Sequence, residues 1–201
     1  MANILELLNS NLTSDVINQF SDRLGADKQK TETATEGAVN ILLAAINKEA
    51  RKGKNTEGLI NALQKDHSGN ILDNINDFAL GRTDNLDSRT TNGAGILNHL
   101  LGSKRGNAVE MLTKTSGLDK ERSGSLLEML APVVMGAVGR QMTQSNADRG
   151  GLMDILQSTM NSRVQNKQEQ SMLEKLLDQD NDGSILDDLL NIGLSFLRRK
   201  R

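Results

Sequence analysis

The sequence contains no cysteine, tryptophan or tyrosine, and its only aromatic residues are Phe20, Phe78 and Phe196. Without cysteine there are no disulfides, zinc–thiolate sites or cysteine nucleophiles, so we expect any bound metal to have oxygen ligands. The core has to be built from Leu, Ile, Val, Met and Ala, a set that favours helices over strands. So few rings offer little surface for base stacking, which argues against single-stranded nucleic acid as a ligand.

Long apolar runs are also missing. No window reaches the roughly 18 apolar residues of a transmembrane helix, and the first residues lack the basic and apolar regions of a signal peptide. The formal net charge is −2 at pH 7, so the chain as a whole is not attracted to phosphate backbones. We therefore expect a cytoplasmic protein that does not bind membranes.

Most of the sequence is repeated. Residues 4–46 align with residues 96–138 at a constant offset of 92, and a Gly-x-Asp-Lys pattern starts at Gly25 in the first copy and at Gly117 in the second. The later matches need larger offsets, because the second copy carries 21 additional residues between its last two helices. The repeat predicts an all-α fold made of two tandem copies of a module of about five helices.

The repeat also predicts the domain organisation. Residues 1–81 form the first module, and residues 94–201 form the second, with the inserted helix extension and an acidic loop. Residues 82–93 between them have no apolar period and are rich in turn-forming residues, so we expect a flexible linker there.

Within the second module, apolar residues at helical spacing predict a helix that Gly117 ends and a further helix that starts at Asp119. Pro132 should break or kink this second helix, because a proline inside a helix loses a hydrogen bond and clashes with the preceding turn. Gly136 and Gly139 follow. Glycines are costly inside a helix, and they indicate that another helix approaches closely.

Four motifs of the second copy occur together: ILNHLLG, SGL, LLEMLAPVVMGAVG and DQDNDGSILDD. In this combination the sequence resembles the bacterial YidB-like family, catalogued as domain of unknown function 937. The likeness is best over residues 93–197 and weaker over the first copy. The resemblance implies an all-helical fold with a helix-turn-helix-like portion in each copy, and it implies no established activity.

The acidic loop is the strongest chemical signal. Carboxylates at loop positions 1, 3 and 5, followed by Gly183, are an arrangement that can wrap a Ca²⁺ ion. Position 12 is Leu189 instead of the usual bidentate glutamate, so we expect weak binding, with a dissociation constant on the order of 10⁻⁴ M or weaker. The candidate ligands are Asp178, Asp180, Asp182, Ser184, Asp187 and Asp188.

A second interpretation of this loop is an acidic helix start, in which the side chains cap the helix and lie near the positive end of its dipole. The first copy supports this interpretation, because its equivalents of the first three ligands are Gln64, Asp66 and Ser68. The fold can therefore make the turn without a full ligand set.

The two histidines, His67 and His99, lie at unrelated positions of the two copies. We expect His99 to be a partly buried structural residue of a short helix. The sequence has no phosphate-binding loop, nucleophile elbow or metalloprotease helix. We therefore predict a non-enzymatic protein that interacts with a protein partner or with itself, or serves as a scaffold.

DNA binding through the helix-turn-helix-like portion is the alternative, and weak divalent-metal binding is the third hypothesis. Acidic residues dilute the basic character of the helix-turn-helix-like portion, whereas DNA-binding modules usually show a stronger basic bias. The candidate nucleic-acid contacts are Lys104, Arg105, Lys114, Lys120 and Arg122.

Overall fold

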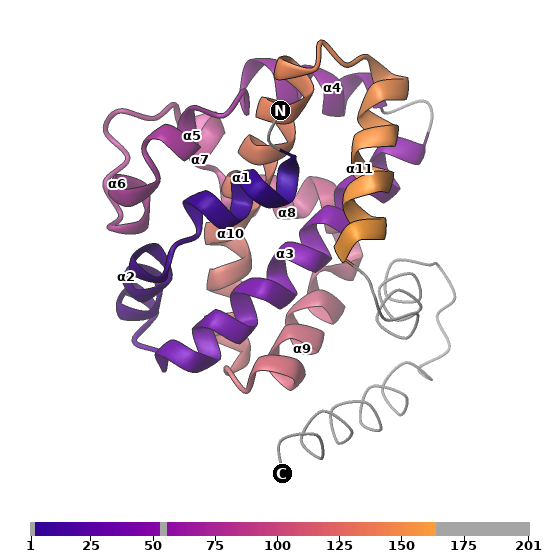
Figure 1. The fold of residues 1–201 in the computed structure, drawn as a ribbon. Coiled ribbons are helices and arrows are strands. Elements are labelled where there is room, and N and C mark those ends of the chain that lie inside the picture. Colours follow the sequence, from indigo (N-terminus) through magenta and orange to yellow (C-terminus); the bar gives the residue numbers. More distant parts are fainter. Residues whose placement is uncertain (1–2, 53–55, 164–201) are drawn as a thin grey trace, which may run out of the picture.

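The computed structural model describes residues 3–52 and 56–163, and this part of the chain is helical, with no strand. The predicted all-α fold is therefore confirmed (Figure 1). The helices are α1 (Ile4–Asn11), α2 (Ser14–Leu24), α3 (Lys28–Arg51), α4 (Thr56–Lys65), α5 (Asn70–Asp73), α6 (Ile75–Ala79), α7 (Ser88–Thr91), α8 (Gly93–Leu101), η1 (Gly102–Lys104), α9 (Arg105–Ser116), α10 (Lys120–Gln144) and α11 (Arg149–Arg163).

Local sequence sets the starts of the two long helices, α3 and α10. The side chains of Asp27 and Asp119 accept hydrogen bonds from the backbone N–H groups three residues on, at 3.0 and 2.8 Å. Just before them, α2 and α9 end at Gly25 and Gly117, whose φ angles of 56° and 74° are left-handed and suit glycine. The same signals thus delimit both helices at the same sequence offset.

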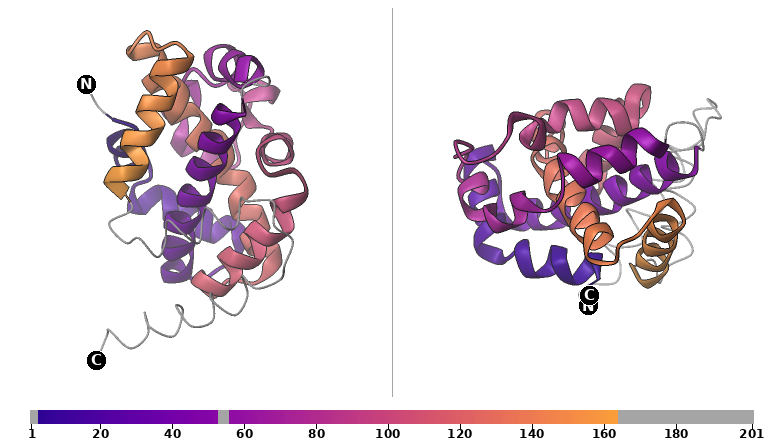
Figure 2. Two further views of the ribbon diagram at one scale, coloured as in Figure 1. Left: turned by 90° about the vertical axis from the view of Figure 1, so that its right-hand side faces the viewer. Right: turned by 90° about the horizontal axis from the view of Figure 1, so that it is seen from above.

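A single cluster of buried apolar side chains runs through the described part of the chain. Helices α3 and α10 cross at its centre, and it includes Leu42 and Ile46 of α3 together with Leu127 and Val134 of α10. Helix α11 packs on α3, and α4 packs on α10, so a helix from each half of the chain packs on the long helix of the other half (Figures 1 and 2).

Of the two outcomes expected at Pro132, a break does not occur, because α10 continues through it from Lys120 to Gln144. A proline at this position deprives only the Glu128 carbonyl of its helical N–H donor. Gly93, the first residue of α8, lies directly against that carbonyl. A Cβ atom on Gly93 would lie 2.6 Å from the Glu128 carbonyl carbon, so only glycine permits the contact, and its Cα–H group can partly replace the lost donor.

Gly136 and Gly139, the two glycines that follow the proline, lie where other helices approach α10 closely. A Cβ atom on Gly139 would lie 2.6 Å from the Leu63 carbonyl oxygen, at the end of α4. One on Gly136 would lie 2.5 Å from Ile71 Cγ2, on α5. The close approach of other helices to α10 is therefore confirmed.

The segment predicted as a flexible linker contains packed structure. Asp87 caps α7 by accepting a hydrogen bond from Arg89 N at 2.7 Å. Thr90 is buried, and its hydroxyl donates to the Asp66 carbonyl at 2.7 Å. The end of this segment is thus fixed to the first half, whereas the division into modules at 81 and 94 stays a prediction.

Candidate functional site

A pocket of about 220 Å³ opens where α4, α7, α8 and α10 meet. It lies between the two halves of the chain, because α4 and the turn after it come before residue 70, whereas α8 and α10 come after residue 92. Its floor is apolar and consists of Leu59, Ala62, Ile96, Leu100 and Met135. The polar lining residues are Asp66, His67, Arg89, Asn92 and His99.

The pocket brings together the two histidines that appeared unrelated in the sequence. His67 follows α4 and is only 4% exposed, whereas His99 lies on α8 and is exposed. The expectation of a partly buried His99 is therefore wrong, because its side chain is exposed to solvent, whereas the neighbouring Ile96 and Leu100 are buried. No spacing rule could have paired the histidines, since they line one pocket only because α4 and α8 both pack on α10.

His67 is the most unusual polar residue of the pocket. Its Nδ1 atom is buried and has no hydrogen-bond partner among the described residues. Burial lowers the pKa of His67 from its ordinary value of 6.5, and the neighbouring Asp66 carboxylate partly opposes this shift. The imidazole is therefore neutral at pH 7.

Two opposite charges stand at the mouth of the pocket. Asp66 Oδ1 and the Arg89 guanidinium are 3.9 Å apart, and the side chains are 33% and 79% exposed. An ion pair that is this long and this exposed contributes little to stability. Both charges therefore remain available to a ligand.

The described part of the chain holds no group of three or more His, Asp or Glu side chains arranged to bind a metal ion. The two histidines and Asp66 thus do not form a metal site on their own. The predicted calcium ligands Asp178, Asp180, Asp182, Ser184, Asp187 and Asp188 lie outside the described residues.

Three of the five candidate nucleic-acid contacts are already paired with carboxylates. Arg105 pairs with Glu128 and Arg122 with Asp119, and Lys114 lies 3.0 Å from Glu110. Hydrogen bonding from Lys114 lowers the pKa of Glu110, and hydrogen bonding from Arg122 lowers the pKa of Asp119. Lys104 and Lys120 lie at the starts of α9 and α10.

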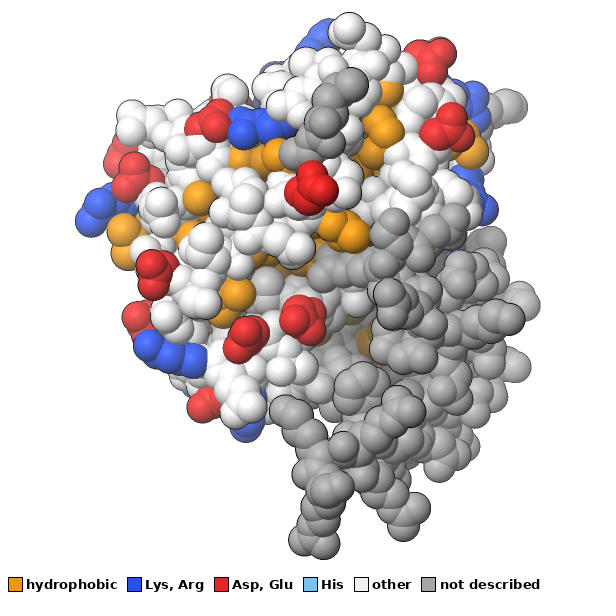
Figure 3. Space-filling view, in the orientation of Figure 1, with side chains coloured by type: hydrophobic (Ala, Val, Ile, Leu, Met, Phe, Trp, Pro, Cys, Tyr) orange, Lys and Arg blue, Asp and Glu red, His pale blue; other side chains and the backbone are white. Residues whose placement is uncertain are grey.

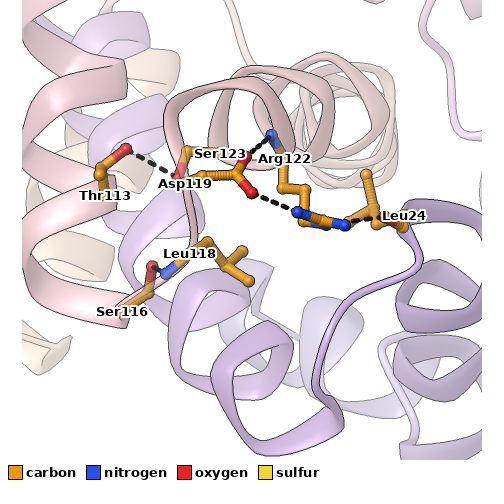
Figure 4. A network of polar contacts seen from close by, with 7 residues as sticks. All are labelled: Leu24, Thr113, Ser116, Leu118, Asp119, Arg122 and Ser123. Atoms are coloured by element: carbon orange, nitrogen blue, oxygen red, sulfur yellow. Dashed lines mark hydrogen bonds and ion pairs between the residues drawn. The ribbon is translucent and has the colours of Figure 1, made fainter.

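The turn between α9 and α10 is tied to the rest of the bundle (Figure 4). Arg122 Nε donates to the Leu24 carbonyl at the end of α2 at 3.0 Å, and the Thr113 hydroxyl bonds to that of Ser123 at 3.0 Å. Beyond its first turn, α10 is largely buried, although a recognition helix has to enter the major groove. On the face drawn in Figure 3, basic and acidic side chains are interspersed over the coloured part.

Among the described helices, none combines the length and the apolar character needed to cross a membrane.

A family model described as "Bacterial protein of unknown function (DUF937)" matches residues 6–141. The match covers every residue that lines the pocket, and it ends before the acidic loop. Neither a curated protein nor a solved structure matches the chain.

Proposed function

The chain belongs to the DUF937 family of bacterial proteins of unknown function, and from this premise we propose that it is a non-enzymatic binding protein whose site is the pocket between α4, α7, α8 and α10. The observation that carries the proposal is an apolar hollow with a few convergent polar groups, one of them the unpartnered His67. Such hollows are typical of ligand sites.

Preorganisation of the pocket walls supports binding. The backbone that carries His67 is held against Gly139 of α10, and Thr90 anchors α7 to the Asp66 carbonyl. A site whose walls are fixed by the core loses little conformational entropy when a ligand enters. The pocket also fits the interaction role predicted from the sequence, with the partner contributing one compact apolar group.

We also infer that the fold arose from two tandem copies, each with a helix-turn-helix-like portion. Matching bounds of α2 and α9, and of α3 and α10, support this proposal. Reciprocal contacts support it further, because Arg122 lies near Gly25 while Lys30, its equivalent in the first copy, lies near Gly117. On this view, the binding site was created at the seam between the copies.

DNA binding is the alternative proposal, supported by the cations of α9 and α10. Its weakness is that Arg105, Lys114 and Arg122 already pair with carboxylates. Duplex binding in a mobility assay, falling steeply with added salt, would favour this alternative.

The two histidines permit a direct test, because they are the only imidazoles of the chain and both line the pocket. Isopentanol, a neutral molecule with a branched chain, should shift both imidazole proton signals in NMR spectra. Ala62→Leu, which fills the pocket, should abolish the shifts, whereas Ala26→Leu in the turn between α2 and α3 should not. Unchanged signals at saturating isopentanol would refute the proposed site.

A further inference from the structure

The mouth of the pocket presents a negative and a positive group side by side. Asp66 Oδ1 and Arg89 Nη1 are 3.9 Å apart, beyond the range of a good hydrogen bond, so each group has unused bonding capacity. An anion placed here would pair with Arg89 but meet repulsion from Asp66, and a cation would meet the reverse. A ligand that carries a positive group and a negative group close together avoids both kinds of repulsion.

Two further side chains add polarity on the positive side. The side-chain oxygen of Asn92 accepts a hydrogen bond from Gly95 N at 2.9 Å, which leaves its NH₂ group as the donor for a ligand. His99 lies one helical turn along α8 from Gly95 and is exposed. The donors Arg89, Asn92 and His99 thus line the same pocket as the single carboxylate of Asp66.

The floor below these groups is apolar. Leu59 is fully buried, and Ile96 and Leu100 are 8% and 6% exposed. The volume of about 220 Å³ is somewhat larger than the cavity of about 150 Å³ that accommodates benzene, so a side chain of about four to six carbon atoms fits. Met135 completes the floor, and its flexible thioether can adapt to the shape of the group that enters.

We infer that the pocket binds a free apolar α-amino acid of about the size of leucine, an inference that rests on the proposed binding site. The carboxylate pairs with Arg89, whose guanidinium can donate two parallel hydrogen bonds to it. The ammonium group pairs with Asp66, and the side chain lies on the floor formed by Leu59, Ile96 and Leu100. An α-amino acid carries both charged groups on one carbon, so its own charges are about as close together as those of Asp66 and Arg89.

Four related probes test each part of this arrangement in the full-length chain. Leucine has both charges, N-acetylleucine lacks the ammonium group, leucinamide lacks the carboxylate, and isopentanol lacks both. Titrations followed by the two imidazole signals should show leucine binding about tenfold more tightly than either singly charged analogue, because a hydrogen bond to a charged group contributes about 1.5–3 kcal/mol.

Two substitutions test the contact with the ammonium group and the contact with the carboxylate separately. Asp66→Asn should weaken leucine binding about tenfold and strengthen the binding of N-acetylleucine, whose carboxylate no longer meets repulsion. Arg89→Gln should weaken leucine binding about tenfold and strengthen the binding of leucinamide for the corresponding reason. Arg82→Gln is the matched control, because Arg82 pairs with Asp77 at 3.4 Å and does not line the pocket. It should leave leucine binding unchanged.

The outcomes separate the inference from the proposed function. If isopentanol shifts the imidazole signals and leucine binds no more tightly than N-acetylleucine or leucinamide, the site stands and the amino-acid inference is overturned. If none of the four probes shifts the signals, both are overturned. Because the comparison of probes uses the unmodified chain, it does not depend on how the variants fold.

Discussion

The two central helices, α3 and α10, start alike and are then packed in different ways. Both follow a left-handed glycine and an aspartate cap, and both run for more than twenty residues. Helix α3 has alanine at position 44 and asparagine at position 47, where α10 has Gly136 and Gly139. At Gly136 a side-chain methyl group of Ile71, and at Gly139 the backbone carbonyls of Leu63 and His67, leave no space for a Cβ atom.

The difference shows that equal topology does not require equal packing. Helix α10 is in contact with α8 and α9 of its own half and with α1, α3, α4 and α5 of the other, so it serves both halves. Helix α3 contains a single glycine, Gly37, where a Cβ atom would lie 3.0 Å from a Leu112 methyl group. We therefore expect the molecule to depend more on α10 than on α3.

Separating the halves should have the largest effect. Because α11 covers α3 and α4 covers α10, fragments 1–82 and 83–201 should each lack cooperative unfolding, and an equimolar mixture should recover it. Circular dichroism during thermal unfolding measures this. If fragment 83–201 unfolds cooperatively on its own, the second module is independent, as the boundaries predicted from the sequence imply.

The second largest effect is expected from adding a methyl group at Gly139, where neighbouring backbone lies closest to α10. Gly139→Ala places a methyl group against the carbonyls of Leu63 and His67 and should lower the free energy of unfolding by about 2–3 kcal/mol, since backbone cannot easily move aside. The matched control is Gly58→Ala, where no atom lies within 4 Å of the added group. It should raise stability by about 0.5–1 kcal/mol. Urea denaturation of both variants provides the measurement, and equal effects would contradict the packing argument.

The reciprocal contacts at the starts of the long helices should differ by a smaller amount. Arg122→Lys loses the hydrogen bond to the Leu24 carbonyl and should cost about 1 kcal/mol. The reciprocal Lys30→Arg, in the first copy, should change the free energy of unfolding by less than about 0.5 kcal/mol. Urea denaturation again reports the result. If Lys30→Arg lowered the free energy of unfolding more than Arg122→Lys, the expected order of the two contacts would be wrong.

The smallest expected effect is on the pH dependence of stability, measured in variants of the two histidines. Because the pKa of folded His67 is lowered from 6.5, the unfolded chain binds the proton more readily, and stability should fall as the pH drops below about 6.5. His67→Gln should reduce this dependence between about pH 7 and pH 5, above the range in which most carboxylates titrate. His99→Gln, at the exposed position, is the matched control variant. Free energies of unfolding measured across this range would contradict the assignment if His67→Gln had no effect on their slope.

A good part of the architecture could be predicted from local sequence. The lack of aromatics and the apolar spacing indicated helices, and the caps at Asp27 and Asp119 mark where the long helices start. Gly136 and Gly139 indicated close helix approach because glycine inside a helix has a cost that only packing offsets. Each of these features depends on residues within a few positions of one another.

Tertiary structure decided the rest. Pro132 leaves α10 unbroken because Gly93, far from it in the sequence, lies against the freed carbonyl of Glu128. The pocket exists because α4 of one half and α8 of the other both pack on α10, which places His67 and His99 in its lining. The repeat in the sequence predicts two sets of helices, but a linear pattern carries no information about which helix of one half packs on which helix of the other.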